Sequence, residues 1–489
     1  MIYRNVEDLL SEDGELNIQT LSSCINEHKV EANKLKTIEK YYNMSFSKQE
    51  ALIYDQQTGK PINNNTKNIR VNFAKEITDL ITSYVFGKPI SYVGGNSDNL
   101  IDWFSEIDED SHNIKLAKMQ SIFGKAFELI YLDELDDEPN VFMPFLAELS
   151  PINTFVVKDT DIRHKTILGC TYREKINYDG KFIGYIATVY TDKYVYTLEG
   201  SNISCLSITD IEEHYFGGVP LIQLNNNEEE KGDYEDVTSL IDAYEDLQHN
   251  RVKDKEQFIN RLLVITNSSL GDDEETYIQS CNTLKNGGIL ELESSSEKPS
   301  DAKFISQQFD ESSVEVLSKR INEDIHRISK TPNLVDEEFS GNSSGVALQY
   351  KLFGTEELGV IKERYFKKLL KKRLRLINNV MTLKNNKDYV VDLKELSIQM
   401  KRNLPVSLDE KIKELQGTQD ILSLRTRLHR YDEDLNVEDE INQLMKEKKE
   451  QANIMSNAFD PYNFPKEDTV LNRDGTNVNT DDNKDEDKQ

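Results

Sequence analysis

The stretch that decides the fold starts with FGGVPL (residues 216–221) and KGDYEDVTSLIDAYEDL (residues 231–247), and it ends with NLVDEEFSGNSSGVALQYKLFG (residues 333–354). Between the last two segments the sequence predicts a compact β/α insert and a second amphipathic helix. The predicted order is therefore helix, insert, helix, polar glycine-containing loop and long third helix. This order indicates a helical spine rather than a catalytic pocket.

Two amphipathic helices are predicted around the insert, because apolar residues recur every three or four positions. The first covers residues 234–260, and the second covers 312–330 with a narrow seam of Val314, Leu317, Ile321, Ile325 and Ile328. Such a seam suits packing against neighbouring helices. Packing as core helices of one large domain is the alternative.

The insert, residues 262–308, is predicted to be a small mixed unit. LLVITN, GGILEL and AKFISQQ have the composition of strands. Asp272 and Asp273 open a short helix, where acidic residues suit the helix dipole. Its inward residues are predicted to be Ile278, Cys281 and Leu284.

The N-terminal part is predicted to be an α+β region that ends near residue 225. Helices are expected at 17–44, at 72–85, where Gly87 and Pro89 stop the helix, and at about 114–127. Strand periodicity follows over 127–208, with turns at Asp179-Gly180 and Glu199-Gly200.

The C-terminal part is predicted to be mostly helical. A long helix is expected over 346–383, with a kink at Gly354 or Gly359, because glycine weakens a helix. More helices are expected from Asp409 onward. The tail after Pro465 is polar and acidic, which predicts disorder.

Composition bounds the class of protein. The chain has 489 residues, enough for two to four domains, and a net charge of −29. That charge is opposite to the basic footprint of a conventional duplex-DNA binder, and it fits either simple solubility or a wall that DNA passes without sticking. No apolar run approaches membrane-spanning length, and the acidic N-terminus predicts no secretory signal. Four scattered cysteines are expected to be ordinary thiols.

Catalytic and cofactor motifs are absent from the sequence. It contains no GxxxxGK[ST], HExxH or GxSxG pattern and no cysteine/histidine cluster at metal-ligand spacing, so no cofactor, metal or catalytic residue is predicted. The strongest basic run is KERYFKKLLKKRLRL (residues 362–376), with eight Lys and Arg. It is interpreted as a solvated helix face, or as a contact with DNA or with an acidic face of a neighbouring subunit; the subunit contact is preferred to DNA.

Several segments, taken in order, resemble one known family. RVNFAKEITDLITSYVFGKPI (residues 70–90), GKAFELIYLDE (residues 124–134) and the motifs of residues 216–354 are similar to the portal proteins of tailed bacteriophages that infect Gram-positive bacteria. A portal is the ring at one capsid vertex through which DNA enters and leaves. The resemblance runs from about residue 70 to residue 377.

The resemblance implies an α+β portal fold with an α/β wing, a helical stem, a small β/α clip and a helical C-terminal crown. Its expected segments are a wing region (1–232), a first stem helix (233–260), a clip (261–308), a second stem helix (309–332), a tunnel loop (333–345), a long kinked wing helix (346–395), a helical crown (396–460) and a disordered acidic tail (461–489).

The resemblance also implies a non-enzymatic role in the virion, with assembly in the bacterial cytoplasm. About twelve copies would form a ring for genome packaging, retention and ejection, with double-stranded DNA in the channel and no membrane partner. Expected partners are the terminase large subunit, the scaffold and major capsid proteins, and head-completion or connector proteins. The expected channel residues are Asp336, Glu337, Glu338, Phe339, Asn342 and Ser343. The alternatives are a metal-dependent nuclease and a DNA-binding module of a phage or prophage.

Overall fold

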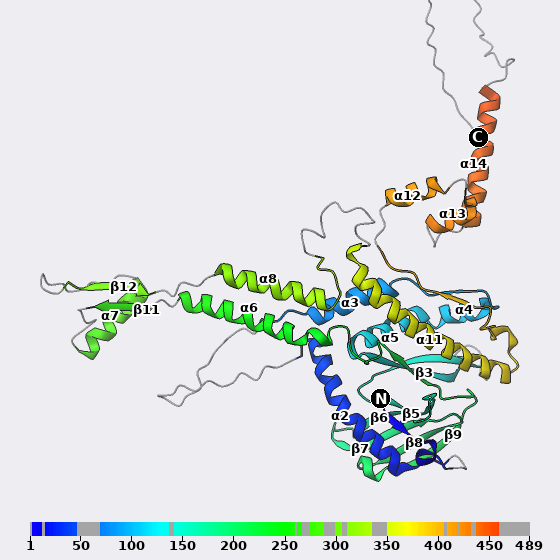
Figure 1. Ribbon diagram of the computed structural model, residues 1–489, viewed down its shortest axis with the longest axis horizontal. Helices are drawn as coiled ribbons and strands as arrows, with labels where there is room; N and C mark the ends of the chain where they lie inside the picture. The colour runs from blue at the N-terminus through cyan, green and yellow to red at the C-terminus, as the bar shows by residue number, and fades with distance from the viewer. Residues whose placement is uncertain are drawn as a thin grey trace, which may run out of the picture. The chain divides into compact units, whose positions relative to one another are not determined.

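The computed structural model describes residues 2–11, 15–45, 69–135, 141–259, 262–266, 273–287, 299–305, 311–334, 350–404, 408–418, 421–431 and 437–458 (Figure 1). The chain divides into two compact units, Met1–Leu404 and Pro405–Gln489. Helices and strands both contribute to the first unit, so the predicted mixed α+β class is confirmed.

A six-stranded sheet forms one part of the first unit. Its order is β1 (Ile2–Arg4), β5 (Thr154–Asp159), β6 (Thr166–Ile176), β7 (Phe182–Tyr190), β8 (Tyr194–Gly200) and β9 (Ser207–Glu213). Only β1 pairs in parallel, with β5. Short helices α1 (Val6–Leu9) and η1 (Ile203–Cys205) accompany it, and the long helix α2 (Ile18–Asn43) shares its apolar core.

The two predicted turns in this sheet have different outcomes. Gly180 adopts a positive φ of 76°, as a glycine turn requires, and it lies between β6 and β7. Glu199 and Gly200 instead belong to β8, where Glu199 pairs with Ile186 of β7. The prediction of a turn at Glu199 is therefore wrong, because cross-strand pairing extends the strand to Gly200.

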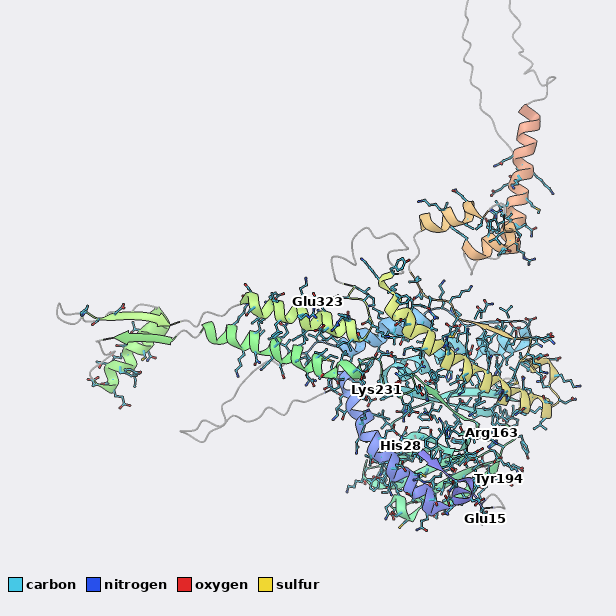
Figure 2. All side chains as sticks on the ribbon, viewed as in Figure 1. Glu15, His28, Arg163, Tyr194, Lys231 and Glu323 are labelled. Atoms are coloured by element: carbon cyan, nitrogen blue, oxygen red, sulfur yellow. The ribbon has the colours of Figure 1, made fainter. Side chains whose placement is uncertain are left out.

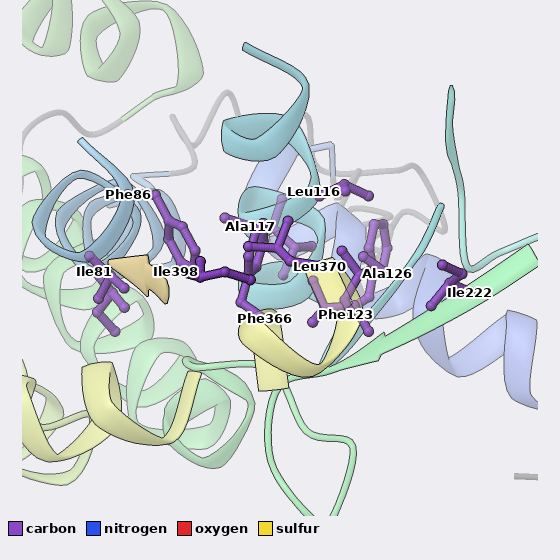
Figure 3. Packing of buried hydrophobic residues seen from close by; sticks show 14 of the residues in the cluster. Ile81, Phe86, Leu116, Ala117, Phe123, Ala126, Ile222, Phe366, Leu370 and Ile398 are labelled. Atoms are coloured by element: carbon purple, nitrogen blue, oxygen red, sulfur yellow. The ribbon is translucent and has the colours of Figure 1, made fainter. Parts of the chain in front are cut away.

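A three-stranded antiparallel sheet carries the larger core. Its order is β10 (Leu221–Asn225), β3 (Lys125–Glu134) and β4 (Phe142–Leu149). The helices around it are α3 (Phe73–Phe86), α4 (Asp98–Glu106), α5 (Glu109–Phe123) and α11 (Phe353–Leu383). Figure 3 shows Phe86 and Phe366 packed in this core, with ring centroids 4.6 Å apart. A small sheet of β2 (Ser91–Val93) and β13 (Ser397–Gln399) and the turn η3 (Lys387–Tyr389) complete it.

The predicted helix at 114–127 has different limits in the structure. It starts at Glu109 and ends at Phe123, because Gly124 takes a left-handed conformation with φ 77° and caps it. Ala126 and Phe127, which the predicted range placed at the end of this helix, lie in β3 instead. Both remain buried, so the apolar pattern identified core residues but assigned them to the wrong element.

The predicted helix pair is present. After the turn η2 (Glu235–Val237), α6 (Thr238–Ile259) lies beside α8 (Glu311–Ile328) (Figure 1). Within the apolar seam predicted on α8, Ile325 is fully buried, but Leu317 and Ile328 are 49% and 45% exposed. The seam is therefore only partly covered within one chain.

The insert between these helices contains β11 (Leu262–Thr266), α7 (Glu274–Gly287) and β12 (Asp301–Ile305). β11 and β12 pair antiparallel, and Asp273 caps α7 by accepting from the Thr276 backbone N–H at 2.8 Å. Gly287, the first residue of the predicted strand GGILEL, ends α7, and the rest of that strand lies outside the described residues. Ile278 was predicted to face inward, but it is 51% exposed, because this small unit covers little of α7.

The long third helix, α11, begins at Phe353 after a turn at Leu352 and runs through Gly354 and Gly359 to Leu383. Its end at Leu383 confirms the limit that the sequence predicted for this helix. Gly359 lies where α11 packs against α3, since a β-carbon there would lie 3.2 Å from Val85 Cγ2. The absence of a side chain lets the two helices approach closely.

The second unit contains α12 (Leu408–Gly417), α13 (Leu424–Tyr431) and α14 (Val437–Ala458), in agreement with the helical pattern predicted after Asp409. The first unit extends beyond residue 396, because β13 pairs with β2. The acidic tail, residues 461–489, lies outside the described residues.

Candidate functional site

The six side chains predicted to face a channel lie outside the described residues. These are Asp336, Glu337, Glu338, Phe339, Asn342 and Ser343. The structure does describe both ends of the segment that carries them, up to Leu334 and again from Tyr350. The candidate site is therefore the set of contacts that hold these two ends.

The two ends of this segment are clamped together at the base of α8. Thr355, buried in the first turn of α11, donates its hydroxyl to the Lys330 carbonyl at 2.8 Å. The Lys330 ammonium also lies 3.0 Å from the Glu357 carboxylate. Because Lys330 and Thr355 are joined in this way, the chain between them leaves and returns at one place. Sequence reasoning placed the loop but gave no signal for the clamp.

Short polar side chains complete the turn after α8. His326 is buried, and its Nδ1 lies 3.4 Å from the Thr331 hydroxyl, which lies 2.6 Å from the Ser329 hydroxyl. Burial lowers the pKa of His326. Lys330 adopts a positive φ of 56°, which ends the helix. The turn thus satisfies its own polar groups where it meets the core.

Polar bridges join α6 and α8 along their length. The Gln248 amide donates to the Ser318 hydroxyl at 2.7 Å. Nearer the insert, Arg251 lies 3.0 Å from Glu311 and 2.8 Å from Glu315, and Lys255 lies 2.7 Å from Glu311. Hydrogen bonds from Lys255 and Arg251 lower the pKa of Glu311. Exposed pairs of this kind contribute little stability individually, but together they favour one alignment of the helices.

The KGDYEDV motif anchors the start of α6 in the core (Figure 2 labels Lys231 there, and Glu323 along α8). The Asp233 carboxylate lies 2.7 Å from the Lys362 ammonium of α11, and both side chains are nearly inaccessible to solvent. Burial lowers the pKa of Lys362, and Asp233 opposes that shift. Tyr234 is fully buried and donates to the Ile38 carbonyl of α2 at 2.9 Å. Adjacent motif residues thereby tie the helix pair to two other helices.

The basic run at 362–376 divides between the core and the surface. Lys362 and Arg373 are buried, where Arg373 binds Glu128, Glu109 and the Asn113 amide oxygen. The interpretation of the run as one solvated helix face is therefore wrong for these two residues. The buried carboxylates on α5 and β3 could not be assigned to Arg373 from sequence, because they are remote in the chain.

The described parts of the chain show neither a metal cluster nor a membrane-spanning helix. No group of three or more His, Cys, Asp or Glu side chains there could hold a metal ion. Among the helices that the structure describes, none combines the length and the apolarity needed to cross a membrane.

Comparison with known proteins gives the family. The model of the family "Phage portal protein, SPP1 Gp6-like" matches residues 21–453, which include the helix pair, its insert and the clamped segment. No curated protein matches the chain. The family match covers most of the chain and extends the resemblance found from residues 70–377 toward both ends. The chain therefore belongs to the SPP1 Gp6-like family of phage portal proteins, which are non-enzymatic structural proteins of the virion that form the DNA channel at one capsid vertex.

Proposed function

We propose that α6 and α8 are the stem helices of this portal, within residues 233–260 and 309–332, and that residues 333–345 form its tunnel loop. Residues 261–308 would be the clip, 1–232 and 346–395 the wing, and 396–460 the crown. The observation that carries this proposal is the clamp between Lys330 and Thr355. It returns the loop to the base of the helix pair, as a constriction built from a stem would require.

The proposed mechanism is passive guidance of DNA. Stem helices from about twelve subunits would build the tunnel wall, and the loops would form its narrowest part. Asp336, Glu337 and Glu338 would repel phosphates, so that the duplex slides without lasting contact. Phe339, Asn342 and Ser343 would complete the collar. Because the sequence contains no nucleotide-binding loop, the energy for packaging would come from a partner.

Family membership implies a ring that interacts with DNA and terminase. The finer proposal is that the terminase large subunit docks on the clip during packaging and that head-completion or connector proteins replace it afterwards. The scaffold and major capsid proteins would contact the ring during assembly. Electron microscopy and mass measurement of the purified ring would give the copy number.

Cross-linking from a single cysteine tests the loop assignment. The background variant would carry Cys205→Ser and Cys281→Ser, since Cys24 and Cys170 are buried. Ser343→Cys would then receive a short photo-reactive group, and labelled portals would be assembled into heads that package DNA. Ser201→Cys, at an exposed position after β8, is the matched control.

The expected result is DNA adducts from position 343 in filled heads and not in empty ones, with few from position 201. Equal yields from the two positions, or none from 343 in filled heads, would contradict the tunnel-loop assignment. Ring formation is scored separately by electron microscopy, so a failed assembly is not mistaken for an unlabelled loop.

A further inference from the structure

A basic groove lies between α11 and the segment that joins β5 to β6. Its volume is about 1030 Å³. Nine Lys and Arg residues line it: Lys158, Arg163, Lys165, Arg364, Lys367, Lys368, Lys371, Lys372 and Arg375. No Asp or Glu is among its lining residues. In a chain with 88 acidic and 59 basic residues, this is a pronounced local reversal of charge.

Positive charge in this groove is poorly compensated within one chain. Lys367 pairs with Glu363 at 2.6 Å. For Lys368, Lys371 and Arg375, all exposed, no carboxylate among the described residues comes within ion-pair distance. Burial, together with the neighbouring cations Lys158, Lys368 and Arg375, lowers the pKa of Lys372 to about 8. The groove therefore favours an anionic occupant.

An acidic face on α4 and the start of α5 has the opposite character. Five exposed carboxylates occur within 13 residues: Asp98, Asp102, Glu106, Asp108 and Asp110. No Lys or Arg occurs in the sequence between Lys88 and Lys115. Partial loss of solvent contact, with the neighbouring charges of Glu109 and Asp108, raises the pKa of Asp110. This face and the groove share no residue.

A closed ring joins two different surfaces of the same chain, one on each flank of the subunit. We propose that the basic groove receives the acidic α4–α5 face of the neighbouring subunit. The inference rests on ring assembly by the family and not on the tunnel-loop assignment. A second copy is favoured over duplex DNA because both complementary surfaces occur on this chain, whereas its net charge of −29 opposes the approach of a polyanion.

Charge reversal on each surface provides the test. One full-length variant carries Lys368→Glu, Lys371→Glu and Arg375→Glu in the groove. The other carries Asp98→Lys, Asp102→Lys and Glu106→Lys on the acidic face. Lys36→Glu on α2, and Lys181→Glu and Lys193→Glu at exposed turns of the six-stranded sheet, form the control for the groove variant, with the same change of charge. Thermal unfolding first confirms that each variant is folded.

Ring formation is measured by mass photometry, with scaffold and major capsid protein present if the unaltered chain needs them. Each reversed variant alone would place like charges together, so its assembly should weaken at least about tenfold, while the control assembles normally. An equal mixture of the two reversed variants should form rings, because alternating subunits restore opposite charges at every interface. One chain carrying all six substitutions should also form rings.

Three results would overturn the proposal. Unimpaired assembly of either reversed variant would show that its surface is not in the interface. Failure of both the mixture and the six-substitution chain to recover would show that the two surfaces do not meet. Normal rings from the groove variant, combined with lost low-salt binding of duplex DNA, would assign the groove to nucleic acid instead.

Discussion

Arg373 of α11 and Glu128 of β3, 245 residues apart in the chain, form an ion pair inside the core, where the Arg373 Nε donates to the Glu128 carboxylate at 3.1 Å. Both side chains are completely buried. Burial alone would raise the pKa of Glu128, but Arg373 and His112 hold it below its ordinary value. The pair thus fixes α11 against the three-stranded sheet. This helix begins beside the clamp between Lys330 and Thr355.

Replacing Arg373 with Met should destabilise the protein by about 3–5 kcal/mol, because it leaves Glu128 and Glu109 buried without their cation. Arg375→Met, on the same helix but exposed, is the control. Urea unfolding at neutral pH measures the difference. Equal losses from the two variants would show that the buried pair does not stabilise the fold in this way.

Gly232→Ala should destabilise the junction between α5 and α6. A β-carbon at this position would lie 2.3 Å from the Ile122 carbonyl oxygen, so the backbone of α5 or of the loop that carries Gly232 must shift. We expect a loss of about 1–3 kcal/mol in the free energy of unfolding. Gly218→Ala is the control, since its nearest neighbour would be Leu376 Cδ2 at 3.4 Å. If Gly232→Ala leaves the free energy of unfolding unchanged, the junction relaxes without cost and the prediction is wrong.

His28 predicts a specific dependence of stability on pH. Burial, with the positive charge of Lys125 nearby, lowers its pKa from 6.5 to about 4, and its ring nitrogens contact the Tyr172 hydroxyl and the Pro151 carbonyl. Between pH 6.5 and 4 the unfolded chain therefore binds a proton that the folded protein excludes. The free energy of unfolding should therefore decrease as the pH is lowered from 6.5 to 4. His28 should account for at most about 3 kcal/mol of that decrease.

His28→Gln should remove that contribution, because an amide keeps both polar contacts and does not titrate. Compared with the unaltered chain, the variant should lose less stability between pH 7 and pH 4.5. His164→Gln, at an exposed position, controls for loss of a histidine as such. Parallel pH profiles for His28→Gln and the unaltered chain in urea unfolding would rule out His28 as the source.

The proposed clip predicts a separable defect in motor docking. Tyr277 and Ile278 on α7 are each 51% exposed. Changing both to Ser should weaken binding of the terminase large subunit tenfold or more, about 1.4 kcal/mol, because exposed apolar and aromatic groups dominate such interfaces. Binding of the terminase large subunit is measured with assembled rings coupled to a sensor surface.

Tyr178→Ser with Ile176→Ser, two exposed residues of the six-stranded sheet, form the matched control for that docking measurement. The control should bind terminase normally. If both double variants bind equally well while forming rings, the docking surface does not include α7. If the clip variant fails to form rings, its side chains contribute to subunit contact instead.

Much of the fold could be predicted because helical periodicity is a local property. The helix pair at 234–260 and 312–330 and the strand region after residue 127 follow from the spacing of apolar residues, which the chain carries wherever it folds. The ends of elements do not follow from apolar spacing alone. The helix predicted to reach Phe127 ends at Phe123, because the left-handed backbone at Gly124 outweighs the continuing apolar pattern.

The sequence predicted where the candidate site lies along the chain, but not the contacts that hold it. The ordered motifs placed a loop between α8 and α11, and the family match supports the identity that this order implied. Nothing in the sequence indicated the clamp between Lys330 and Thr355. A hydrogen bond from a hydroxyl to a carbonyl in another element produces no repeating pattern of residues. The same limit hid the close approach of Gly359 to Val85.

The sequence by itself determined most helices, most strands, the acidic charge and the family, because periodicity, composition and motif order are carried along the chain. Only the tertiary structure decided which charges of the run at 362–376 lie inside. Lys362 and Arg373 are buried because Asp233 and Glu128 meet them there, while Lys368 and Lys371 line a groove. A charged side chain enters a core only where folding brings an opposite charge to it, and that meeting is set by contacts between distant segments.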